Sequence, residues 1–300
     1  MSGGWRLRIV HRTQVRYQGP VRASYNEARM TPLALPRQSV LNADVRADIP
    51  VPIWTYSDYW GTDVSSFDIQ APHEELEIIA QATVETRPAP APPRPLSWAV
   101  LRERVTDAAD AAGTAGTPGT ADTADRTLLE FLTPTSRTAV TAELAETARQ
   151  RTAGADPLEA AGEIVSWVNQ RVSYVPGATE VQTGAQEAWD MGKGVCQDMA
   201  HLTVALLREV GLPARYVSGY LHPIAAAEPG DEIEGESHAW VEYWDGEWIA
   251  CDPTNLAPVG ERHVVVAAGR DYGDVPPLKG IYRGAPNSSM QVAVTVTRLA

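Results

Sequence analysis

Three side chains in the second half of the chain have the chemistry of a thiol nucleophile and its activating groups. The first, Cys196, follows a glycine-containing loop, "MGKGV", and opens a helical pattern, "CQDMAHLTVALLREV". The start of a helix presents free backbone N–H groups and a partial positive charge. Both favour a thiolate over a thiol, and the same N–H groups can hold an oxyanion. The sequence therefore favours Cys196 as a nucleophile.

The other two side chains, His238 and Asp252, lie in strand-like runs joined by Asp245-Gly246, which is a strong hairpin signal. His238 opens "HAWVEYW" and Asp252 closes "WIACD". Counting outward from the turn makes the two residues rough cross-strand neighbours. We therefore expect Asp252 to accept a hydrogen bond from Nδ1 of His238, which leaves Nε2 facing Cys196.

The same residues allow three other interpretations. Cys196 could be a buried structural thiol, or it could pair with Cys251, although strand alternation points Cys251 away from the Asp252 side. A zinc site is the third, with the ligands Cys196, His201, His238 and Asp252. No Cys-x-x-Cys or His-x-x-x-His spacing supports it, and His201 sits at a poor angle on the helix. We expect no metal and no cofactor, with His201 anchoring helix packing or a local hydrogen bond.

Residues beside these positions have simpler explanations. Trp240 and Tyr243 could line a substrate cleft, but ordinary sheet core explains them at least as well. Asp198 is expected to interact with the helix dipole, and Thr254 and Asn255 to shape the turn that holds Asp252. The remaining histidines have no nucleophile near them in the sequence and are expected to be structural or exposed: His11, His73, His222 and His263.

The first third of the chain has the pattern of short antiparallel strands. "RLRIVHRTQVRY", "VLNADVRADI" and "ELEIIAQATVET" are strand-like, with a turn expected at Gly19-Pro20. "IWTYSDYWGTDVSSFDI" is typical of a hairpin with Gly61 near its turn. Strands at this spacing predict a small sandwich or barrel over residues 1–87.

A change of composition follows. "RPAPAPPRPL" cannot supply a regular hydrogen-bond ladder, and "DAADAAGTAGTPGTADTAD" is nearly free of large apolar side chains. We predict a flexible linker over residues 88–126 and a second domain over 127–300. In that domain, "ADPLEAAGEIVSWVNQRV" has a helical pattern with Asp156 as N-cap and Pro157 at the first helical position, and "CQDMAHLTVALLREV" has a second one that stops at Gly211. Strand patterns follow in "ARYVSGYL", "SHAWVEYW", "EWIACD" and "MQVAVTVTRL".

Four motifs in order, "GVCQDMAHL", "PARYVSGYL", "SHAWVEYW" and "CDPTN", resemble the core of the transglutaminase-like superfamily in its bacterial branch. "HRTQVRY", "YNEARMTPL" and "SSFDIQAPHEELEI" resemble the β-domain that precedes this core in bacterial relatives. The resemblance implies an α+β fold, in which an antiparallel β-domain is followed by a papain-like core of helices packed on an antiparallel sheet.

The resemblance also implies a catalytic triad of Cys196, His238 and Asp252. The family contains cross-linking enzymes, proteases and amidases. A tryptophan follows the cysteine in vertebrate cross-linkers, whereas this chain has "CQD", which weakens the transfer of cross-linking activity and calcium dependence. We expect hydrolysis of a peptide or protein amide through a thioester. Acyl transfer to an amine and a non-catalytic peptide-binding module are the alternatives.

Composition limits the partners. The chain has 25 basic and 38 acidic residues, a formal net charge of -13, and 44% hydrophobic residues. A folded core is expected, and an extended nucleic-acid or anionic-membrane surface is not. The start has no signal-peptide pattern and no run long enough for a membrane helix. We therefore predict a cytoplasmic protein, and the sequence leaves its oligomeric state open.

Overall fold

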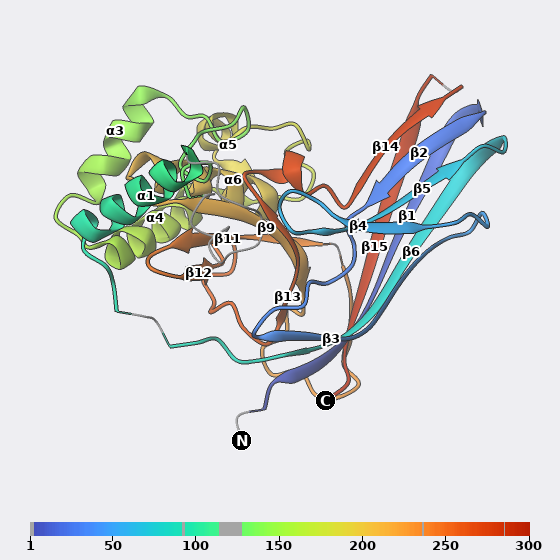
Figure 1. Ribbon diagram of the computed structural model, residues 1–300, viewed down its shortest axis with the longest axis horizontal. Helices are drawn as coiled ribbons and strands as arrows, with labels where there is room; N and C mark the ends of the chain where they lie inside the picture. The colour runs from blue at the N-terminus through green and yellow to red at the C-terminus, as the bar shows by residue number, and fades with distance from the viewer. Residues whose placement is uncertain (1–2, 92–93, 114–127, 236, 285) are drawn as a thin grey trace.

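The computed structural model describes residues 3–91, 94–113, 128–235, 237–284 and 286–300. In Figure 1 the helices gather on one side of the molecule and long strands extend to the other. The sheet that carries β9, β11 and β13 lies between these two parts. Antiparallel strand pairing dominates the three larger sheets, so the predicted α+β class is confirmed.

Two antiparallel sheets form a sandwich, in the orders β10-β15-β1-β6-β3 and β14-β2-β5-β4. Side chains of both sheets meet in one apolar cluster that includes Phe67, Ile69, Leu76 and Ile78, so of the two predicted alternatives the structure has a sandwich and not a barrel. The strands are β1 Trp5–Val21, β2 Ala23–Ala28, β3 Gln38–Ala47, β4 Trp54–Ser57, β5 Asp63–Ile69, β6 His73–Thr86, β10 Glu232–Gly235, β14 Leu278–Arg283 and β15 Ser288–Arg298.

The second part is a four-stranded sheet, β12-β11-β9-β13, with helices packed against it. Its strands are β9 Ala214–Leu221, β11 His238–Trp244, β12 Trp248–Cys251 and β13 His263–Gly269. The helices are α1 Trp98–Gly113, α3 Ala142–Arg151, α4 Pro157–Arg171, α5 Ala185–Met191 and α6 Cys196–Glu209. A short strand pair, β7 Ser173–Tyr174 with β8 Lys193–Gly194, and a 3-10 turn, η1 Tyr272–Asp274, complete it.

Local signals explain where the two central helices begin and end. Asp156 caps α4 by accepting a hydrogen bond from the Glu159 N–H, and Pro157 takes the first helical position. Helix α6 is followed by Gly211, whose φ of 94° suits a glycine, and Pro213 lies just beyond. Both predicted helices are confirmed. Helix α6 is almost wholly buried, as expected for the helix at the centre of this part.

One face of β1 connects the two parts of the molecule. The odd-numbered residues of Trp5–Ile9 pack into the apolar core shared with the helices. Val15, further along the same face, packs inside the sandwich. His11 and Thr13 lie between these two regions, and both are buried. Because strand residues two apart share a face, one strand contributes to both cores and to the junction between them.

The predicted domain boundaries are wrong in two places. Strand β14 pairs with β2 and β15 pairs with β1, so these parts of the predicted 127–300 core belong to the sandwich. An alternating strand pattern does not reveal its partner. Within the predicted linker 88–126, α1 buries Leu101 and Val105, which share one helical face. Residues 114–127 of that stretch lie outside the described residues.

The turn predicted at Gly19-Pro20 is a bulge instead. Strand β1 continues to Val21, with a register shift between Arg16 and Val21, and Gly19 has a φ of 117°. The predicted hairpin near Gly61 is confirmed, because β4 and β5 pair on either side of it. Within the described ranges, no helix has the length and apolar character needed to cross a bilayer.

Candidate active site

Cys196 is the first residue of α6, and its side chain is half-buried. It is not in a disulfide, and neither is Cys251. Asp198 holds the start of this helix in place. Its Oδ2 accepts hydrogen bonds from the Val195 N–H at 2.7 Å and the Thr179 hydroxyl at 2.6 Å. Asp198 thus caps the helix directly, beyond the predicted dipole interaction.

Gly194, two residues before Cys196, packs closely against the Asp198 side chain and leaves no room for a Cβ atom. A Cβ atom at Gly194 would lie 2.8 Å from the Cβ and Oδ2 atoms of Asp198. Burial raises the pKa of Asp198, while its hydrogen bonds to Thr179 and Val195 oppose that shift. The loop "MGKGV" therefore lets the cap reach the backbone directly beside Cys196.

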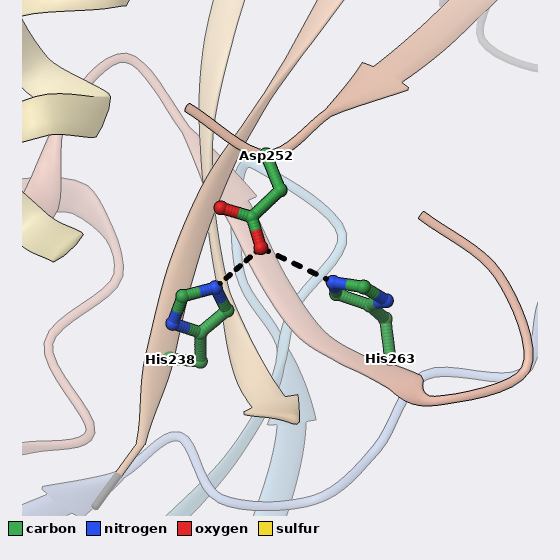
Figure 2. Close-up of side chains that lie close together, drawn as sticks. All are labelled: His238, Asp252 and His263. Carbon is green, nitrogen blue, oxygen red and sulfur yellow. Dashed lines mark hydrogen bonds and ion pairs between the residues drawn. The ribbon is translucent and has the colours of Figure 1, made fainter. Parts of the chain in front are cut away.

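His238 and Asp252 are in direct contact, as predicted, but through the other ring nitrogen. Nε2 of His238 lies 2.8 Å from Oδ2 of Asp252 (Figure 2). The expectation that Nδ1 would face the carboxylate is wrong, and Nδ1 is the nitrogen left for Cys196. The His238 side chain is 10% exposed and that of Asp252 is 0% exposed, so the pair is well shielded from water.

The hairpin register explains how the two residues meet. Val241 pairs with Cys251. The next residue, Asp252, therefore lies opposite Trp240 and not opposite His238. Asp252 also lies one residue beyond the end of β12. Alternation places it on the same face as Trp240 and His238, and its side chain reaches His238 diagonally.

Asp252 accepts hydrogen bonds from five donors. Oδ1 accepts from the backbone N–H groups of Thr254, at 2.9 Å, and Asn255, at 3.2 Å. Oδ2 lies 2.8 Å from Nδ2 of Asn255, 2.8 Å from Nε2 of His238 and 3.4 Å from Nε2 of His263. The prediction that Thr254 and Asn255 shape this turn is confirmed, and the Asn255 side chain adds a direct contact.

These contacts set the charges of the pair. Burial favours a higher pKa for Asp252, but hydrogen bonds from His238, His263 and Asn255 outweigh it and hold the pKa well below the usual range. Burial also works to lower the pKa of His238. Its interactions with Asp252 and Cys196 oppose this effect and raise the pKa to about 9. At neutral pH the site therefore holds an imidazolium against a buried carboxylate.

His263 is the residue of the site that was not predicted. It starts β13, which is separated from β11 by β9 in the sheet. The strand between them has Gly219, where a Cβ would lie 2.7 Å from the Trp240 ring and 2.0 Å from the Val264 carbonyl oxygen. The ring of Trp240 therefore crosses above β9 and packs edge-on against His263 at 5.3 Å. Only this pairing of strands brings His263 to Asp252.

The donor atoms of His238, Asp252 and His263 lie within 4.8 Å of one another, so their types and spacing fit a metal. The hydrogen bonds argue against that use. Nδ1 of His263 accepts a hydrogen bond from the Gly260 N–H at 3.4 Å, which puts the proton of the neutral ring on Nε2. Nε2 then donates to Asp252 and has no lone pair for a metal.

The zinc set with His201 is also not assembled for a shared ligand. Nε2 of His201 accepts the Tyr272 N–H at 3.1 Å, so the hydrogen bond connects α6 to the distant η1 turn and is not local in the sequence. The ring is fully buried against Tyr216, and burial lowers the pKa of His201 to about 3. His201 is thus a neutral core residue.

Cys196 and His238 open into a cleft of about 330 Å³ between the helical part and the sandwich. The sandwich contributes His11 and Thr13 from β1, and Val292 from β15. A larger hollow of about 760 Å³ lies near Arg87, and none of the candidate catalytic residues lines it. The cleft with the thiol is therefore the candidate active site.

Other side chains considered from the sequence are structural. Trp240 is fully buried and Tyr243 is nearly so, as expected for sheet core. His11 is buried, with Nδ1 at 3.0 Å from the Tyr220 hydroxyl and Nε2 at 3.1 Å from Oγ1 of Thr13. Burial lowers the pKa of His11 to about 4, so the ring is neutral.

Comparisons with known proteins agree with this architecture. Residues 145–253 match the model of the transglutaminase-like superfamily, and residues 7–85 match the bacterial transglutaminase-like N-terminal region. The crystal structure of "a Putative Cysteine Protease" from Cytophaga hutchinsonii has a TM-score of 0.74 at 22% identity. It covers 100% of this chain and 92% of its own, which shows a shared fold.

Relatives in sequence extend over nearly the whole chain. Uncharacterized protein ML0607 of Mycobacterium leprae is 39% identical over 296 residues, covering 99% of this chain and 100% of its own. A protein-glutamine gamma-glutamyltransferase of Pseudomonas aeruginosa is 32% identical over 166 residues, covering 48% of this chain and 23% of its own. The chain is thus a member of the transglutaminase-like superfamily and carries the bacterial transglutaminase-like N-terminal region.

Proposed function

We propose that this protein is a thiol-dependent hydrolase of peptide or protein amides, with Cys196 as nucleophile, His238 as general base and acid, and Asp252 as the orienting carboxylate. The observation that carries the proposal is the buried His238–Asp252 pair, which leaves Nδ1 of His238 for a thiol at a helix start in the same cleft. Family membership supports thiol chemistry without choosing between hydrolysis and transfer.

In the first half-reaction the Cys196 thiolate attacks the carbonyl carbon of the amide. Backbone N–H groups at the start of α6 stabilise the oxyanion of the tetrahedral intermediate. The imidazolium of His238 gives its Nδ1 proton to the leaving nitrogen as the C–N bond breaks. A thioester on Cys196 and a free amine result, and the carboxylate of Asp252 keeps the ring in position throughout.

In the second half-reaction, water loses a proton to Nδ1 of His238 and attacks the thioester. The C–S bond breaks, the thiolate returns, and the acyl group leaves as a carboxylic acid. We favour water because it is abundant unless a site is built to exclude it.

A second candidate is transfer of the acyl group to an amine. The similarity to the Pseudomonas aeruginosa gamma-glutamyltransferase over about half of this chain favours it. The same thioester would then form an amide bond with an amine in place of water. The chemistry of the first half-reaction is shared, so the two functions differ only in the acceptor.

Alkylation by iodoacetamide tests the nucleophile, and Cys251 is a built-in control. Burial raises the pKa of the Cys251 thiol, so at pH 7 only Cys196 should react. We expect peptide mapping to show fast labelling of Cys196, slowed at least tenfold in His238→Ala. Slow labelling of Cys196 that does not depend on His238 would favour a non-catalytic binding module.

Mass spectrometry of the intact protein after incubation with a cell lysate tests the acyl-enzyme. A thioester adduct is expected on Cys196 and not in the Cys196→Ala protein. Addition of an alkyl amine then separates the two candidates, because a transferase converts the adduct into an amide product whereas a hydrolase mainly releases the acid.

A further inference from the structure

We infer that the sandwich forms an apolar subsite for the acyl donor, and that Met290 selects substrates with an apolar side chain next to the scissile amide. This inference rests on the proposed function, since it concerns what the thiol acts on. Met290 lies on β15 and lines the same cleft as Cys196 and His238. Met290 is 53% exposed, so its side chain is accessible to a ligand in the cleft.

The sandwich wall of the cleft is apolar. Met290 and Val292 point to the same side of β15, two residues apart, and Pro277 and Leu278 line the cleft from the start of β14. Met290 pairs with Val15 of β1, whose side chain is inside the sandwich. The wall is therefore an exposed continuation of the sandwich core.

Charge in the cleft is sparse apart from the catalytic pair. Among the lining residues that the structure describes, Glu180 is the one carboxylate, and it lies on an exposed loop of the helical part. The other polar lining groups are neutral, among them Thr13, Ser218 and Gln197. An acidic side chain on the donor would meet no cation among the described residues of the sandwich wall, whereas an apolar one would be covered by Met290. Methionine also adapts its shape to ligands.

Affinity labels for the thiol test this subsite without a known substrate. Acetyl-leucine chloromethyl ketone and acetyl-glutamate chloromethyl ketone differ in the side chain beside the reactive carbon. Each alkylation rate is divided by the rate with iodoacetamide, a label without an amino-acid side chain. This corrects for differences between variants in the reactivity of the Cys196 thiol. We expect a leucine-to-glutamate ratio of about ten or more in the wild type, and a drop of roughly tenfold in Met290→Lys.

Two variants are matched controls. Met290→Leu keeps an apolar side chain and should retain the ratio. Leu41→Lys places the same charge at an apolar residue of β3 that is 50% exposed and does not line the cleft, and it should also retain the ratio. Equal rates for both labels in the wild type, or an unchanged ratio in Met290→Lys, would overturn the subsite. Failure of iodoacetamide itself to label Cys196 would instead overturn the proposed function.

A second inference comes from the carboxylate side of the site: His263 is a positioning residue that fixes Asp252. The ring is 4% exposed, its tautomer is set by the Gly260 N–H, and Nε2 points at Oδ2 of Asp252. The groups that face it are Asp252, His238 and, next to it in the chain, Arg262. Burial lowers the pKa of His263, so the ring remains a neutral donor at pH 7.

Rescue by a conservative variant tests this role. His263→Gln retains an N–H donor near Asp252, whereas His263→Leu has none. We expect the rate of acyl-enzyme formation to fall at least tenfold in the leucine variant and to recover largely in the glutamine variant, with little change in KM.

The titration of the His238 ring is a second measurement, and it should not change if His263→Leu only disturbs packing. By proton NMR its titration midpoint should move below about 9 in His263→Leu, because Asp252 is then held less firmly against Nε2. If His263→Leu only lowers the free energy of unfolding, while the rate and the His238 midpoint stay at their wild-type values, the positioning role is wrong.

Discussion

Two largely buried histidines, His238 and His11, border the same cleft, and their pKa values are shifted in opposite directions. Each ring has two polar contacts or more, and each is largely shielded from water. The partners of His11 are hydroxyl groups, and its pKa is lowered to about 4. His238 contacts a carboxylate, and its pKa is raised to about 9. Burial alone favours the neutral ring, and the interactions of His238 with Asp252 and Cys196 reverse the outcome.

The comparison shows that the protonation state of a histidine in this cleft depends on its hydrogen-bond partners and not on how deeply the ring is buried. His201 supports this view, because its ring is also fully buried without a bonded carboxylate and its pKa is lowered to about 3. Asp252 can remain charged only because its own hydrogen-bond donors compensate for lost water. The acid and its donors therefore function as one unit.

The largest expected effect is from Asp252→Asn, which removes the charge with little change of shape. The pKa of His238 should fall below 6.5, as for His11, and acyl-enzyme formation should slow about 10³–10⁴-fold. Stopped-flow measurement of acylation and NMR titration of the ring check both effects. Asp245→Asn is the control, since Asp245 is buried in the turn of the same hairpin, and a loss of similar size there would contradict the explanation.

The reverse experiment gives His11 a carboxylate. In Thr13→Asp the new side chain replaces the hydroxyl that lies 3.1 Å from Nε2 of His11. The pKa of His11 should rise from about 4 to at least its ordinary value of 6.5. NMR titration of the ring measures the shift, with the neutral Thr13→Asn variant as control. Identical midpoints in the two variants would show that charge is not the cause.

The pH dependence of stability provides a third test. His11 has a lower pKa in the folded state than its unfolded value near 6.5, so its contribution is complete above pH 6.5 and is lost as the pH falls toward 4. This contribution is about 3 kcal/mol for a shift of that size. The free energy of unfolding, measured with urea at pH 7 and pH 5, should differ less between the two pH values in His11→Gln than in the wild type.

The raised pKa of His238 acts in the other direction. Its stabilising effect is complete below pH 6.5 and is lost as the pH rises through about 9. The wild type should therefore be less stable at pH 10 than at pH 7, and His238→Gln should reduce that difference. An equal loss in both proteins would assign the alkaline effect to other groups.

The smallest effect is expected from Asn255→Ala. Asp252 loses one donor at 2.8 Å but keeps those of His238, His263 and two backbone N–H groups. Acylation should slow about fivefold, corresponding to roughly 1 kcal/mol, as measured with the same stopped-flow assay. A loss above a hundredfold would mean that this side chain contacts the substrate or the thiol directly.

Much of the site could be predicted from the sequence because its parts are local. The glycine loop before Cys196, the Asp245-Gly246 turn and the alternation of β11 place the three residues correctly within their elements. The identity of the bonded ring nitrogen was not predictable, because it depends on a diagonal reach across the hairpin. His263 was missed because its contact requires β13 to pair with β9, and no local pattern specifies that pairing.

The same reason explains one of the two errors in the domain boundaries. The alternation in residues 288–298 predicts a strand, but its partner β1 lies at the far end of the sequence. The helix at residues 98–113 was missed because it follows a Pro-rich stretch and its second half is part of the Ala-rich one, although Leu101 and Val105 have helical spacing. Long-range pairing decided the place of β15, whereas the helix was missed because of its local composition.

The return of β14 and β15 to the sandwich has a consequence for biosynthesis. Cys196, His238 and Asp252 are all synthesised before the later wall residues of the cleft, which are Pro277, Leu278, Met290 and Val292. A nascent chain can thus assemble the reactive thiol before one wall of its cleft exists. Because β15 pairs with a strand made at the very start, this wall forms late, and the selection proposed for Met290 would follow the assembly of the proposed catalytic residues.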